Sequence, residues 1–146
     1  MPRADFKFNF PKRVRFAEVD AQAVVFNSRY LEYFDIGLVE YWRAVGLYSG
    51  PGLAGGPEVH VVKASVEYRA PILLDEVVAI CIRCSRIGCT SLTFVLELHC
   101  GDGEDLRATG EEVHVNVGAA RGRPEPLPPA VIAKFEAFEG RKLRDL

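Results

Sequence analysis

One carboxylate, Asp20, lies in a short segment between two regular patterns of the 146-residue chain. The residues before it alternate like a strand, and from about residue 28 onward apolar residues recur at helical spacing. A carboxylate in this place lies near Asn27, beside the free backbone N–H groups of a first helical turn. A base and a set of N–H donors are the two parts that acyl hydrolysis requires.

Capping is the alternative function for both residues. An Asp between a strand and a helix is usually a turn or capping residue, and Asn27 or Ser28 can serve as the N-cap of the following helix. Glu18, two residues earlier, has the pattern of a solvated charge at a strand end. The pattern by itself therefore leaves catalysis and capping both open.

The cysteines raise the question of a metal site. Cys81 and Cys84 match C-x-x-C, and His99-Cys100 follows. Residues 77–82 have a strand pattern, in which an offset of three places the two thiols on opposite faces. The Gly-rich knuckles of a zinc ribbon are also missing. We expect no metal and reduced, partly buried thiols. The histidines are scattered over predicted strands and form no triad: His60, His99 and His114.

The surrounding elements must position Asp20. Residues 5–18 predict a half-buried strand, with apolar side chains on even positions. A helix follows from about Ser28 to Val45 and stops at Gly46, with Gly37 inside it. A connection rich in Gly and Pro spans 47–57. Further strands are predicted over 58–70, 76–86, 91–100 and 106–117, and a short helix over 130–138.

This order predicts an α+β fold, an antiparallel sheet with one long helix buried against a single face. We expect a single domain over 1–146, with a core at about 6–118 and a C-terminal connector and short helix over 119–146. The helix has more aromatic residues than one buried stripe needs, which indicates a partner subunit. They are Tyr30, Tyr33, Phe34, Tyr41 and Trp42.

Composition excludes several classes of protein. Hydrophobic residues make up 49% and charged residues 26%, the formal net charge is −2, and the pI is about 5.9. These values fit a globular protein and do not indicate a nucleic-acid partner. No run reaches the roughly 18 apolar residues of a membrane span. The first residues lack the apolar stretch of a signal peptide, so we expect a cytoplasmic protein.

Two blocks carry a family resemblance, RFAEVD at 15–20 and AVVFNSRYLEYF at 23–34. Weaker landmarks follow in the same order at 66–71, 74–76, 87–92 and 108–110. Over about residues 6–138 the chain resembles the hotdog-fold acyl-CoA thioesterases of the 4-hydroxybenzoyl-CoA thioesterase type. The resemblance implies a curved sheet wrapped around one long central helix and subunits that join their sheets edge to edge. It also implies active sites at the interface of a homodimer or homotetramer, reached by the pantetheine arm of coenzyme A, with no metal or organic cofactor.

The resemblance also implies roles for individual residues. Asp20 matches the catalytic acid, which either attacks the thioester carbonyl or acts as a base on water. The backbone N–H of Asn27 matches the oxyanion donor. We expect contacts with the substrate or coenzyme A at Val25, Phe26, Tyr68, Arg86 and Ser91.

For three of these residues another role stays open. Arg86 is expected to face solvent if it does not hold the coenzyme A phosphates. Ser91 is otherwise a polar residue at a strand start, and Tyr68 a core or interface residue. The chain also departs from the family at two positions, with Ala23 where Gly is usual and Asn27 where many relatives have His. Ala does not tolerate a positive φ as Gly does, so Ala23 bears on the tightest part of the loop.

The expected function is hydrolysis of a small acyl- or aroyl-coenzyme A. One alternative is a thioesterase for acyl-carrier-protein substrates, and another is a non-catalytic dimer that binds acyl thioesters, which Ala23 favours. Hotdog dehydratases and hydratases are disfavoured, because the sequence offers no local candidate for their Asp/His or His/Glu pairing.

Overall fold

A computed structural model describes residues 2–48, 52, 56–118 and 123–144. Most of the predicted connection at 47–57, and residues 119–122 of the C-terminal connector, lie outside the described residues. The elements are the 3-10 helices η1 (Arg3–Asp5) and η2 (Phe16–Glu18), the helices α1 (Arg29–Val45) and α2 (Pro129–Glu139), and the strands β1 (Phe8–Arg13), β2 (Val59–Tyr68), β3 (Val77–Ile87), β4 (Ser91–Cys100) and β5 (Leu106–Asn116).

The first strand is shorter than the alternation over 5–18 predicted. β1 ends at Arg13, and the next residue, Val14, is fully buried and donates its N–H to Glu76 O at 2.9 Å. The chain then turns into η2. The alternating pattern persists beyond Arg13 because Val14 still faces the core, although its backbone has left the β1–β3 ladder. The later strands and both helices begin and end within about two residues of their predicted bounds.

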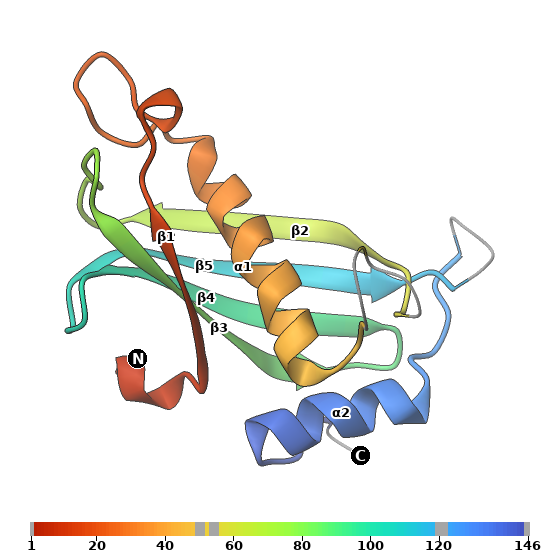
Figure 1. The fold of residues 1–146 in the computed structure, drawn as a ribbon. Coiled ribbons are helices and arrows are strands. Elements are labelled where there is room, and N and C mark those ends of the chain that lie inside the picture. Colours follow the sequence, from red (N-terminus) through yellow and green to blue (C-terminus); the bar gives the residue numbers. More distant parts are fainter. Residues whose placement is uncertain (1, 49–51, 53–55, 119–122, 145–146) are drawn as a thin grey trace.

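The five strands form one antiparallel sheet in the order β1-β3-β4-β5-β2, and α1 lies across one face of it (Figure 1). β4 is the central strand, and its even-numbered side chains are buried in the core under α1. These are Leu92, Phe94, Leu96, Leu98 and Cys100. The prediction of an antiparallel sheet around one long helix is confirmed. The short helix α2 packs beside α1 and β3, with Phe135 fully buried.

Gly37 is the point of closest approach between α1 and the sheet. A Cβ atom at this position would overlap Ile80 Cγ2 and lie 2.9 Å from Ile82 Cδ1. The glycine is therefore explained by two β3 side chains that occupy the space of its missing side chain. This contact sets how deeply the helix sits on the sheet.

The two cysteines of the C-x-x-C motif lie on opposite faces of the sheet, as predicted. Cys81 packs with Phe6 and Ala79 on the outer face, whereas Cys84 belongs to the core under α1. Among the described residues, no group of three or more His, Cys, Asp or Glu side chains could hold a metal ion.

Two of the histidines are paired with glutamates, which corrects one expectation. His99 Nε2 lies 2.9 Å from Glu97 Oε1, and His114 Nε2 lies 2.9 Å from Glu112 Oε1. The expectation that the chain offers no His/Glu pair was wrong, because residues two apart in a strand share a face. All four side chains are buried in the packing of the sheet.

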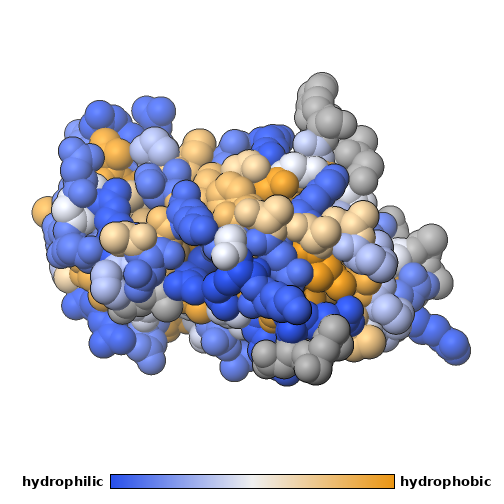
Figure 2. Space-filling model, turned by 90° about the horizontal axis from the view of Figure 1, so that it is seen from below, coloured by the Kyte–Doolittle hydropathy of each residue, from blue (hydrophilic) through white to orange (hydrophobic). Residues whose placement is uncertain are grey.

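No helix in the described part of the chain is long and apolar enough to cross a membrane. The face seen from below mixes hydrophilic and apolar residues (Figure 2).

We predict that Gly37→Ala destabilises the protein, although alanine normally favours a helix. The added methyl group overpacks the contact with Ile80, which typically costs about 1–3 kcal/mol. Thermal unfolding of Gly37→Ala, Ile80→Ala and the double variant measures the effect. Because Ile80→Ala removes the overlapping methyl, the double variant should lose less stability than the sum of the single variants. A stabilised Gly37→Ala would contradict this packing.

Candidate active site

The segment before α1 contains a tight hairpin. Asp20 N donates to Val24 O at 2.9 Å, and Ala23 N donates to Asp20 O at 2.9 Å. This is the pattern of a hairpin with a three-residue loop, whose third residue takes a left-handed backbone. Ala23 has φ of 61° and occupies that position. Sequence reasoning predicted a plain loop here. The family's usual glycine at position 23 could have indicated this left-handed turn, because glycine adopts a positive φ easily.

Ala23 thus adopts the conformation that glycine would adopt more easily. A left-handed backbone costs an L-residue roughly 1–2 kcal/mol. Bonds on either side of it hold the conformation. Leu74 N donates to Ala23 O at 3.2 Å, and Val25 N donates to Ile72 O at 2.8 Å. Single β-bridges join Val19 to Val25 and Val24 to Leu73.

The Asp20 side chain is exposed and partly committed to the turn. Its Oδ1 accepts the Gln22 N–H at 2.8 Å, so the turn role considered for this residue is real. Among the described residues, no donor is hydrogen-bonded to Oδ2. One carboxylate oxygen therefore fixes the side chain, and the other is available for chemistry.

Asn27 presents a backbone N–H that has no acceptor among the described residues. It precedes the N-cap of α1, Ser28, whose side chain makes no capping hydrogen bond. The position of the cap was predicted, but side-chain capping does not occur. Asn27 O accepts the Tyr68 hydroxyl at 3.0 Å, which holds the helix start against β2. The free N–H and the positive end of the helix favour an anion at this place.

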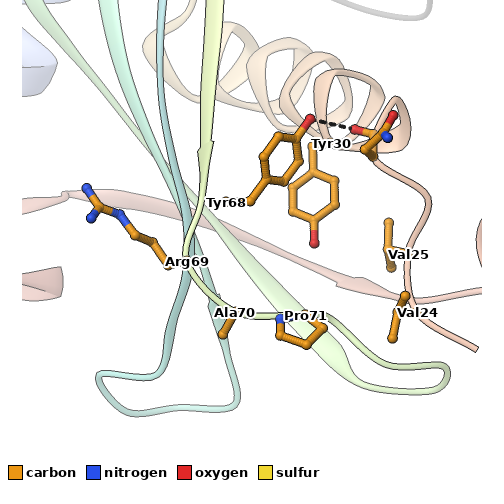
Figure 3. Close-up of a pocket in the computed structure, with 8 residues that line it drawn as sticks. Val24, Val25, Tyr30, Tyr68, Arg69, Ala70 and Pro71 are labelled. Atoms are coloured by element: carbon orange, nitrogen blue, oxygen red, sulfur yellow. Dashed lines mark hydrogen bonds between the residues drawn. The ribbon is translucent and has the colours of Figure 1, made fainter. Parts of the chain in front are cut away.

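A cavity of about 320 Å³ opens at this end of the molecule (Figure 3). The rings of Tyr30 and Tyr68 meet edge to face, with centroids 4.8 Å apart. In the close-up, Val24 and Val25 lie across from the tyrosines, and Arg69 points away. The lining is mostly apolar and consists of Val24, Val25, Asn27, Tyr30, Tyr68, Arg69, Ala70 and Pro71.

The structure brings together three of the predicted site residues, Val25, Asn27 and Tyr68, in this cavity. Tyr68 is 54% exposed, which excludes a core role within one chain. Asp20 is not one of the lining residues, but its N–H donates to the carbonyl of Val24, which lines the cavity. Phe26 is 49% exposed and lies outside the lining.

Arg86 and Ser91 lie at the other end of the sheet in the same chain. Ser91 pairs with Val115 on β5, whereas Tyr68 pairs with Ala108. At about 3.3 Å per residue, these positions on β5 are roughly 23 Å apart. Neither residue therefore joins the cavity of its own chain.

Sequence reasoning did not assign five of the lining residues: Val24, Tyr30, Arg69, Ala70 and Pro71. The sequence could have indicated them, because all five belong to the segments 23–34 and 66–71 that resemble the thioesterase family. Those blocks are far apart in sequence, and only the fold places them on one cavity.

Glu18 supports the loop and is more than a solvated charge. Its Oε1 accepts the Arg15 N–H at 2.8 Å and the Tyr33 hydroxyl at 2.8 Å, and its carboxylate forms an ion pair with Lys12 at 2.9 Å. Burial opposes ionisation of Glu18, but the hydrogen bonds from Arg15, Lys12 and Tyr33 outweigh it and lower the pKa of the carboxyl. Glu18 O also accepts the Phe26 N–H at 3.0 Å, which closes the base of the hairpin.

Comparison with known proteins identifies a family. Residues 14–135 match the model of the thioesterase-like superfamily. The acyl-CoA thioester hydrolase YbgC of Escherichia coli is 27% identical over 129 residues, covering 88% of this chain and 96% of that protein. The acyl-CoA thioesterase YbgC of Haemophilus influenzae is 27% identical over 132 residues, covering 90% and 96%. A thioesterase from Thermus thermophilus, solved in complex with coenzyme A and Zn, is 29% identical with a TM-score of 0.82, covering 95% of this chain and 98% of that one.

We predict that Ala23→Gly stabilises the protein by about 1 kcal/mol, because glycine removes the left-handed strain at this position. For a domain of this size the thermal midpoint should rise by about 2–4 °C. The control is Gln22→Gly in the same loop, where φ is not positive. That change only loosens the unfolded chain and should destabilise by about 0.4–1 kcal/mol. A lower midpoint for Ala23→Gly would contradict the assigned strain.

Proposed function

The chain belongs to the thioesterase-like superfamily, and on that premise we propose that it hydrolyses the thioester of a small acyl- or aroyl-coenzyme A. It is a thioester hydrolase, as its acyl-CoA thioester hydrolase relatives and thioesterase structural neighbours support. The observation that supports the assignment of the site is one apolar cavity whose lining includes Asn27, with its free N–H, and Val24, which is bonded to Asp20 across the hairpin. The coenzyme A in the related Thermus structure supports the choice of substrate.

In the proposed mechanism the Asn27 N–H donates a hydrogen bond to the thioester carbonyl oxygen. This bond stabilises the negative charge that develops on the oxygen. Asp20 acts in one of two ways. As a nucleophile, its oxygen bonds to the carbonyl carbon and expels the coenzyme A thiolate, and water then hydrolyses the mixed anhydride. As a base, it takes a proton from the water that attacks the carbonyl, and the departing thiolate recovers that proton. Neither route uses a metal or organic cofactor, and we propose that none is required.

We further propose that the active form is a homodimer, or a tetramer built from such dimers. β2 is an edge strand that pairs with β5 alone among the described strands. It exposes 50% of Val61, 61% of Val62 and 54% of Tyr68, which is unusual for an unprotected edge. A second copy that adds its own β2 across a two-fold axis would run antiparallel and cover these side chains. The cavity lies at one end of β2, so this pairing would enclose it. A cytoplasmic location stays a prediction from the sequence.

We predict that Asp20→Asn lowers kcat by about 10²–10⁴-fold on acyl-coenzyme A substrates. Asparagine keeps an amide oxygen that can accept the Gln22 N–H, so the variant preserves the turn and removes only the chemistry. The measurement is thiol release from short, long and aromatic acyl-coenzyme A and from acyl-carrier-protein thioesters.

The matched control is Asp102→Asn, at an exposed position in the turn between β4 and β5, which should keep full activity. Wild-type turnover by a folded Asp20→Asn variant would exclude this role of Asp20. Faster hydrolysis of the carrier-protein thioester would reassign the substrate. Binding without hydrolysis of any thioester by the unaltered protein would favour the non-catalytic alternative.

We predict that Val62→Lys converts the dimer into a monomer and lowers turnover, because a charged side chain at an exposed edge opposes strand pairing. Sedimentation velocity measures the mass, and thiol release measures the activity. Val77→Lys, at a 37% exposed valine away from β2, should change neither. An unchanged mass for Val62→Lys would exclude this interface.

A further inference from the structure

Arg107 on β5 makes an unusually complete set of hydrogen bonds. Its side chain is 13% exposed, and all five guanidinium N–H groups have acceptors. Nε and Nη2 donate to Asp105 Oδ1 and Oδ2 at 3.0 and 2.8 Å. Nη1 and Nη2 donate to Glu76 Oε1 and Oε2 at 2.8 and 2.9 Å. The second Nη1 N–H donates to Pro71 O at 2.7 Å.

The backbone of Arg107 holds the same region. Its carbonyl accepts the N–H groups of Arg69 at 2.9 Å and Ala70 at 3.1 Å. Arg69, Ala70 and Pro71 form one wall of the cavity. Arg107 therefore fixes that wall through its main chain and its side chain together.

From Glu76 the bonds continue to the hairpin that carries Asp20. Glu76 Oε1 accepts the Leu73 N–H at 2.8 Å, and Glu76 N donates to Leu73 O at 3.2 Å. The turn that they close contains Asp75 with φ of 71°, a strained conformation for a residue other than glycine. The residues on either side of Leu73 bind the hairpin, through the Leu74 N–H to Ala23 O and the Val25 N–H to Ile72 O.

We propose that Arg107 is a positioning residue for thioester hydrolysis. It holds the segment 69–76 in place, and that segment in turn holds the hairpin that carries Asp20 and contributes Val24 to the cavity. The inference rests on the proposed function, because it assigns Arg107 a part in the reaction of Asp20. Arg107 also lowers the pKa of both Glu76 and Asp105, so both carboxylates stay ionised against it over the neutral range.

The two carboxylates offer a matched pair of variants. Glu76→Ala and Asp105→Ala each remove one carboxylate from Arg107, but only Glu76 belongs to the segment that binds the hairpin. Arg107→Lys keeps the positive charge but loses the planar guanidinium group, whose N–H donors bind Pro71, Glu76 and Asp105 together. The measurements are kcat, KM and the hydrogen exchange of the Val25 and Leu74 amides, with the β4 amides as an internal reference.

We expect Glu76→Ala and Arg107→Lys to speed exchange at Val25 and Leu74 relative to β4. They should lower kcat by about 10²-fold, as a misplacement of about 1 Å can do. Asp105→Ala should change neither quantity. Equal effects of Glu76→Ala and Asp105→Ala, or a loss of kcat with unchanged exchange at Val25 and Leu74, would overturn the inference.

A further comparison separates positioning from general stability. If Arg107 acts through Asp20, Arg107→Lys should add no loss to the residual rate of Asp20→Asn, because residues that act as a unit are not additive. A role in overall stability would lower both rates by the same factor, and would overturn the inference. If Asp20→Asn keeps wild-type turnover, the role of Asp20 fails, and the proposal for Arg107, which acts through Asp20, is overturned with it. If the unaltered protein hydrolyses no thioester while exchange responds as expected, the proposed function fails and the structural link from Arg107 to the hairpin stands.

Discussion

The candidate site depends on a few backbone hydrogen bonds between two segments far apart in the sequence. The hairpin at residues 20–24 has no core of its own, and it is attached where Val25 N bonds Ile72 O and Leu74 N bonds Ala23 O. Val25 and Ile72 are 4% and 0% exposed, so the attachment is anchored in the core beneath it. These bonds fix the hairpin that carries the exposed acid against the turn at residues 72–74.

Backbone strain concentrates at the same junction. In the described part of the chain, the residues other than glycine with positive φ are Ala23 and Asp75. One lies in the hairpin and the other in the turn that supports it. Strained conformations of this kind persist only where the surrounding bonds hold them, and they are common near functional sites. Here those bonds come from Glu76 and Leu74, and behind them from Arg107.

The site is open in a single chain. Asp20 and Asn27 are exposed, and Tyr68 forms a cavity wall at the end of an uncovered edge strand. Electrostatic stabilisation of an oxyanion is most effective where water is excluded. A second copy paired along β2 would provide that exclusion, which is why the dimer and the chemistry are proposed together.

The sequence by itself determined the elements and their faces, because hydrophobic periodicity reports local geometry. It predicted α1 from its 3.6-residue repeat, four later strands from their alternation, and the separation of Cys81 from Cys84. It also singled out Asp20, in the segment between the first strand and the long helix, as the candidate acid. The His–Glu pairs were open to the same reasoning, because their members lie two residues apart on one strand. The bonds that attach the hairpin at Ala23 and the bonds of Arg107 were decided by the tertiary structure. Val24 and Leu73 are joined by a bridge across 49 positions of the chain, and Arg107 reaches Pro71 across 36. Such contacts arise only when the sheet brings strand ends together, and no local pattern in the residues encodes them.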